Sequence, residues 1–179
     1  MNRNILFLPA LFSGLLIVAA CNNGNNDKRR SFADVVEYND FVVDQVNGLD
    51  SAYVLSVDTE QGIDVCMRKC DSLVELCNHA TEELMGIQPF EGDSSLTMQA
   101  LKYVQFMRNN GEHEVKKLLK MIEAYQQMDY DADPEKEEQT LADIDKAADL
   151  LDERYEKEIN RLEAVQTKLS QKHDFRVLK

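Results

Sequence analysis

Three of the four cysteines in this chain, Cys66, Cys70 and Cys77, have a spacing that could place reactive thiols side by side. Offsets of four and eleven residues bring all three within about 40° on one face of an α-helix. Such a row could form a thiolate metal site, an attachment point, a redox switch or a disulfide. It could also be three small side chains in a core, because cysteine is among the residues most often buried. A zinc site needs about four ligands and no second cysteine pair is present, so we expect core packing and no metal.

Two polar residues, Asn39 and Glu158, interrupt helical stripes that are otherwise apolar. A polar side chain in such a position must find a hydrogen-bond partner, and it can specify how two helices align. We expect this structural role, with the two residues bonded to each other or to a neighbouring Gln or Arg. The alternative is a small pocket in which they bind a ligand.

The acidic residues Asp129, Asp131 and Asp133 alternate along the chain as they do in a calcium-binding loop. An EF-hand loop needs glycine at its sixth position and glutamate at its twelfth, where this chain has Pro134 and Thr140. We therefore expect these aspartates to form a turn and to cap the helix that follows.

The histidines and the remaining motifs give no sign of catalysis. A di-iron bundle requires Glu-x-x-His motifs on two helices, and the chain contains none; His79, His113 and His173 are expected on separate helices, with His173 near a frayed end. There is no nucleophile elbow and no phosphate-binding loop. The sequence predicts no enzyme, no catalytic residue and no cofactor.

The start of the chain is typical of an exported protein. Arg3 precedes an apolar run that ends in Val18-Ala19-Ala20-Cys21, and a basic start, a short apolar segment and small residues describe a secretory signal peptide. The run is shorter than the ~20 apolar residues that span a bilayer. Its last four residues resemble a bacterial lipobox. The resemblance implies cleavage before Cys21 and a diacylglycerol on its sulfur, so that Cys21 is the lipidation site.

The lipobox divides the chain into three parts. Residues 1–20 are the expected lipoprotein signal peptide, residues 21–30 a lipidated flexible tether, and residues 31–179 the folded domain. Two or more acyl chains hold a protein stably on a membrane. Asn22 follows the lipidated cysteine, and by resemblance to the enterobacterial sorting rule it implies the outer membrane, with the domain facing the periplasm or the cell surface.

The net charge of the chain argues against some classes of binding partner. The chain has 33 acidic and 20 basic residues, a net charge of −13. Nucleic acids and anionic lipid surfaces attract basic patches, so this balance argues against both. We expect the membrane, through the lipid on Cys21, and a protein as partners, and no nucleic acid.

Four amphipathic stretches must position these residues. The first helix is expected from Ser31, its proposed cap, to about residue 57, with a weak point at Gly48. The other three are expected from the Asp58–Gln61 region to Gly86, from residue 95 to 125 with a kink at 109–111, and from 134 to about 170. Short turns join them. The sequence thus predicts an all-α, antiparallel, up-down-up-down four-helix bundle with elongated helices.

The lengths of these helices predict an uneven shape. With four helices, both ends of the domain and the turn at 88–94 lie at the membrane-proximal end. The third and fourth helices are longer than the first two by some eight residues, which corresponds to about 12 Å. We expect the last helical hairpin to project beyond the others.

Two short motifs add a further resemblance. Glu37-Tyr38-Asn39-Asp40 and a closing helix of the form Leu162…Gln166…Leu169…Phe175, together with the lipobox, resemble uncharacterised helical surface lipoproteins of Gram-negative bacteria. This resemblance implies export and a helical bundle, and it assigns no activity.

The sequence supports two hypotheses about function. The first is a membrane-anchored, non-enzymatic lipoprotein that binds a protein partner or helps to assemble the cell envelope. The alternative is a periplasmic or surface carrier of a small ligand or metal.

Overall fold

The computed structural model describes residues 29–128 and 134–177, and all of their regular elements are helices, which confirms the expected all-α class. The α-helices are α1 (Val35–Val57), α2 (Ile63–Met85), α3 (Ser95–Asn109), α4 (Val115–Gln126) and α5 (Pro134–His173). The 3-10 helix η1 (Thr59–Gln61) precedes α2, and the π-helix η2 (Asn110–Glu114) lies between α3 and α4. None of the helices in the described residues combines the length and the apolar character needed to span a bilayer.

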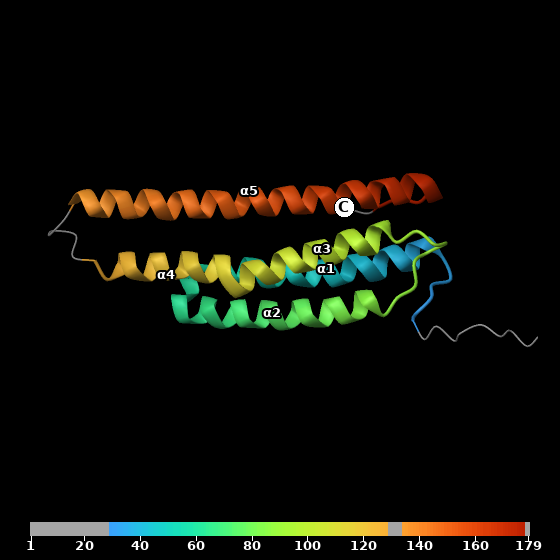
Figure 1. Ribbon diagram of the computed structural model, residues 1–179, viewed down its shortest axis with the longest axis horizontal. Helices are drawn as coiled ribbons and strands as arrows, with labels where there is room; N and C mark the ends of the chain where they lie inside the picture. Colours follow the sequence, from blue (N-terminus) through green and yellow to red (C-terminus); the bar gives the residue numbers. More distant parts are fainter. Residues whose placement is uncertain (1–28, 129–133, 178–179) are drawn as a thin grey trace, which may run out of the picture.

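The helices lie side by side along the long axis of the molecule (Figure 1). Helix α1 packs most extensively on α2, α2 packs on α3, and α5 runs along both α3 and α4. The described N-terminal residues, the α2–α3 connection and the C-terminal end of α5 lie at one end. The end of α4 and the start of α5 lie at the other, beyond the ends of α1 and α2, so the expected projection of the last hairpin is confirmed.

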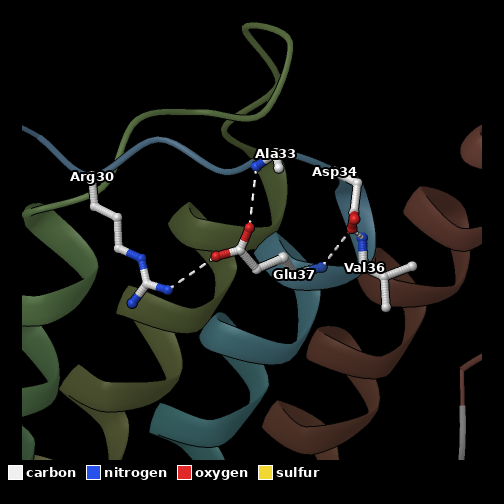
Figure 2. A network of polar contacts seen from close by, with 5 residues as sticks. All are labelled: Arg30, Ala33, Asp34, Val36 and Glu37. Carbon is white, nitrogen blue, oxygen red and sulfur yellow. Dashed lines mark hydrogen bonds and ion pairs between the residues drawn. The ribbon is translucent and has the colours of Figure 1, made fainter.

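The start of α1 differs from the expectation that Ser31 caps it. The helix begins at Val35, and Asp34 is the cap: its Oδ1 accepts hydrogen bonds from the backbone nitrogens of Val36 and Glu37, both at 2.9 Å (Figure 2). The carboxylate of Glu37 in turn accepts a hydrogen bond from the backbone nitrogen of Ala33 at 3.1 Å. A carboxylate at this position satisfies two otherwise unpaired N–H groups. Its negative charge also interacts favourably with the positive end of the helix dipole.

Arg30, assigned to the tether on sequence grounds, is part of the folded domain. Its backbone nitrogen donates to the oxygen of Gly86 and its oxygen accepts from the nitrogen of Gln88, both at 2.8 Å. Its guanidinium pairs with Glu37 at 3.2 Å and lies 4.5 Å from the centre of the Phe41 ring. The sequence could not show the backbone pairing because Gly86 and Gln88 lie more than fifty residues away from Arg30. The folded domain therefore begins by Arg30.

The turn between α1 and α2 uses the expected pair. Helix α1 runs through Gly48 without a break and ends at Val57, as expected. The amide of Gln61 donates to the carboxylate of Asp58 at 2.6 Å and closes η1. Gly62, with a φ of 92°, then reverses the chain into α2, and Gly86 ends that helix.

The expected kink in the third helix is the π-helix η2, which carries the chain from α3 into α4 without a gap. Gly111 sits in this segment, and a Cβ there would lie 3.1 Å from both the carbonyl oxygen of Cys70 and Cγ2 of Val74. The absence of a side chain therefore allows close approach to α2. The π-helix occurs mostly as single turns inside α-helices, and here the rod contacts α2 on both sides of the turn.

The core lies mainly between α1, α2 and α3. Fully buried members include Tyr38, Leu49, Leu73, Tyr103 and Met107. Helix α5 has 40 residues and ends at His173, three residues after the expected end at Ser170. Only Leu151, Leu162 and Leu169 of this helix are buried. The longest helix is thus the least covered.

Candidate functional site

The cysteine row lies in the core of α2, where the side chains of Cys66, Cys70 and Cys77 have no exposed surface. All three are free thiols, and the Sγ of Cys66 donates to the carbonyl oxygen of Asp58 at 3.1 Å. Burial raises the pKa of each thiol, that of Cys77 to about 12. Because the thiolate is the nucleophile and the metal ligand, this environment favours the protonated, apolar form. Among the described residues, no group of three His, Cys, Asp or Glu side chains is placed to hold a metal ion.

Asn39 and Glu158 do not bond to each other. Asn39 is 5% exposed, and its side-chain oxygen accepts a hydrogen bond from the amide of Gln166 on α5 at 3.0 Å. Its own amide donates to Asp40 at 3.1 Å. Glu158 pairs with Arg161 one turn along α5. Asn39 is thus paired with a Gln and Glu158 with an Arg, the two residue types expected as partners. The Asn39–Gln166 hydrogen bond joins α1 to α5.

Some of the remaining candidate residues lie outside the described part of the chain, and His173 lies within it. Cys21 and the three aspartates of the 129–133 turn lie outside the described residues. His173 is the last residue of α5, so its expected place at the helix end is correct, but that end is packed and not frayed: the side chain is 13% exposed and its ring lies edge-on against Phe90, with centroids 5.5 Å apart. Lys172 beside it pairs with Asp93 at 3.0 Å. These contacts hold the end of α5 to the α2–α3 turn.

A polar cluster at the centre of the bundle escaped the sequence analysis. The hydroxyl of Tyr103 on α3 donates to Asp50 on α1, and the ring of Tyr155 on α5 stacks on Tyr53 with centroids 5.2 Å apart. Burial raises the pKa of Asp50, while hydrogen bonds from Tyr103 and Tyr155 oppose that rise. A buried tyrosine hydroxyl needs a hydrogen-bond partner. This requirement is the one sequence signal that could have pointed to a polar partner for Tyr103. The cluster fastens three helices together.

A groove of about 290 Å³ lies between α4 and α5. Its apolar lining consists of Leu118, Met121, Ala147, Leu150 and Leu151. It begins where the core ends and follows the projecting hairpin away from α1 and α2.

The groove is open because the hairpin has no third layer. We call the described residues 120–128 and 134–150 the tip; none of them is buried. Leu150 is 44% exposed and Leu141 38% exposed. The hydroxyl of Tyr125 donates to Glu137 at 3.2 Å and links the two helices here. A two-helix hairpin cannot cover its own apolar stripe, and other helices must complete it.

Charged side chains line the rim of this groove. Arg154 lies at its end nearest the core, 4.0 Å from Glu114, and Asp143 lies at its end nearest the tip, where it accepts a hydrogen bond from Gln139 at 3.0 Å. Lys117 and Lys146 complete the rim. In a chain of net charge −13, the rim has three basic and two acidic groups. An apolar floor with charges of both signs around it suits contact with another polypeptide.

Comparisons of this chain with protein-family models, with curated protein sequences and with solved structures find no match.

Proposed function

We propose that this protein is a bacterial outer-membrane lipoprotein, anchored by acyl chains on Cys21, whose folded domain is a non-enzymatic protein-interaction module. In this proposal the helices form an antiparallel up-down-up-down four-helix bundle behind a short tether. The α4–α5 groove is the binding surface for a protein partner. The domain faces the periplasm or the cell surface.

The positions of the chain ends support this arrangement. Arg30 is hydrogen-bonded to the α2–α3 connection, and this connection lies at the end of the molecule opposite the tip (Figure 1). A lipid on Cys21 therefore keeps the first end near the bilayer and leaves the tip pointing away from it. The bound partner then meets the groove without competition from the membrane.

The observation that carries the proposed role is the lack of any buried residue in the tip, although its helices bear apolar side chains. Leu141 and Leu150 in the tip are 38% and 44% exposed, and the apolar side chains of a partner can cover them. The polar residues that could have served a ligand-binding carrier are already paired: both ends of the Asn39 amide have partners. The groove is thus the surface best suited to binding.

The anchor is tested by mass spectrometry of the mature protein from its own host. The expected N-terminal peptide begins at Cys21 and carries the mass of its acyl chains. Cys21→Ser is expected to move the protein from the membrane fraction to the soluble fraction. An unmodified peptide that retains Met1 would contradict the anchor.

The role is tested by photo-crosslinking in intact cells. A photoreactive residue at Leu150, in the groove, is expected to give an adduct of one defined mass. The control position is Met85, which is 65% exposed but lies at the C-terminal end of α2, away from the groove. Equal adducts at both positions, or none at Leu150, would contradict a specific docking surface.

A further inference from the structure

We propose that the occupant of the α4–α5 groove is the same groove of a second copy of this chain, in a two-fold symmetric dimer with the α5 helices antiparallel. This inference rests on the proposed function, since it names the partner of the same surface. It is drawn from the arrangement of side chains along the groove rather than from its openness alone.

The charged residues of α5 follow an order that suits pairing with a second copy. Asp143 lies at one end of the groove and Arg154 at the other, eleven residues or about 16 Å apart along the helix axis. A two-fold axis perpendicular to α5 exchanges the two ends of the groove. It therefore brings Asp143 of one copy opposite Arg154 of the other, twice in each dimer. A surface that meets its own copy in this way is self-complementary, as an isologous interface requires.

The side chains between those charges also differ in size. An axis midway between residues 143 and 154 passes close to position 148 or 149, so it also places Leu150 of one copy opposite Ala147 of the other. Leu150 is 44% exposed, while Ala147 beside it leaves room in the groove wall. A large side chain meeting a small one is the pattern that lets two helices pack closely. The same register thus satisfies both the charges and the sizes.

The tip has two helices, and a second copy would supply two more. Each copy offers two helices with an uncovered apolar stripe, and two such hairpins together make four helices around one core. The Arg154 side chain is 47% exposed and lies 4.0 Å from its intrachain partner Glu114. That contact is at the limit of an ion pair, so the guanidinium is available to a carboxylate across the interface. Because the α5 helices are antiparallel, the anchored ends of the two copies lie at opposite ends of the dimer, so copies that stand upright pair from two facing membranes.

The test is crosslinking of the full chain, extracted from its membrane in detergent, with a short bis-maleimide at Leu150→Cys. The native thiols in the described residues are buried, so the new thiol is the reactive one there, and Met85→Cys is the control. The expected product has twice the mass of the chain at position 150 and is absent at position 85. Thermal unfolding of each variant, followed by circular dichroism, verifies that the fold is retained.

Charge exchange then tests the register. Arg154→Asp in the Leu150→Cys background opposes two carboxylates at each contact and is expected to lower the dimer yield about tenfold. Adding Asp143→Arg restores opposite charges at the same places and is expected to restore the yield. A dimer yield that does not respond to either change would overturn the proposed register.

The outcomes separate this inference from the proposed function. A photo-adduct at Leu150 whose mass is not twice that of the chain overturns the second copy as occupant and leaves the groove as a docking surface for another protein. No adduct of any mass at Leu150 overturns both.

Discussion

Helix α2 and the first half of α5 are both amphipathic, yet they have opposite fates in the folded protein. Six of the 23 residues of α2 are buried, and they include all three cysteines. Over residues 134–150, α5 buries none. The difference lies in their neighbours: α2 has α1 on one side and α3 on the other, whereas the start of α5 has only α4.

The comparison teaches that an apolar stripe shows what a helix can bury and not whether it is buried. The apolar stripe of α2 is buried in the core, so its residues contribute to the stability of the fold. Along the tip the same kind of stripe remains available, and a partner can use it. The following predictions test this contrast, beginning with the largest expected effect.

Truncation of matched leucines should separate the two regions. Leu73→Ala removes a fully buried side chain from α2 and is expected to lower the free energy of unfolding by about 2–5 kcal/mol. Leu150→Ala in the tip is expected to change it by less than about 0.5 kcal/mol. Urea unfolding followed by circular dichroism, at concentrations where the protein is monomeric, measures both. Similar losses for the two variants would show that the tip is not open.

Two glycines provide the next contrast. Gly111→Ala would place a Cβ 3.1 Å from the backbone oxygen of Cys70, which cannot move aside as a flexible side chain can, and should cost about 1–3 kcal/mol. Gly48→Ala meets no atom within 4 Å in the middle of α1 and should stabilise the protein by about 0.4–1 kcal/mol. Melting temperatures that shift in opposite directions for the two variants would support the close approach at Gly111. An unchanged melting temperature for Gly111→Ala would refute it.

The Asp50 cluster should give a pH dependence of defined sign. Burial raises the pKa of Asp50 in the folded protein, so ionisation favours the unfolded state. The contribution of Asp50 to stability therefore falls as the pH rises above its unfolded pKa of about 3.9, and it levels off above the folded pKa. Asp50→Asn removes this fall. The measurement is the difference in unfolding free energy between the wild type and this variant across the acidic range, and a difference independent of pH contradicts the prediction.

Asp93 should show the opposite and smallest effect. Hydrogen bonds from Ser95 and Lys172 hold the pKa of Asp93 at about 2. The resulting stabilisation is present above pH 3.9 or so and is lost as the pH falls through about 2. Because the Lys172 side chain is half exposed, Asp93→Asn should cost less than about 1 kcal/mol at neutral pH. Lys172→Met should reproduce part of this loss, and a loss that persists unchanged at pH 2 would exclude the electrostatic explanation.

Much of the fold could be predicted because helix signals are local. The ends of α1 and α2 and the continuous rod through Gly111 follow from apolar periodicity, glycine and turn residues. The cap of α1 was misplaced because Ser31 and Asp34 are both good capping residues and no local signal decides between them. Tyr103 was missed for a related reason: its burial depends on where α1 and α5 lie against α3.

The candidate site was less predictable. The cysteine row attracted attention because its residue types are rare and reactive, yet its place in the core gives those thiols a packing role. The groove consists of ordinary residues such as Ala147 and Leu150, which carry no chemical signal. Its existence depends on the different lengths of the helices and on the lack of a third layer beside them.

The sequence by itself determined the helical class, the approximate ends of the helices and the pattern of polar and apolar faces, because each depends on residues within a few turns of one another. Only the tertiary structure decided which of those faces are covered, which buried polar groups meet, and where a groove remains. These depend on packing between segments far apart in the chain, and no local pattern records which neighbour a helix will have.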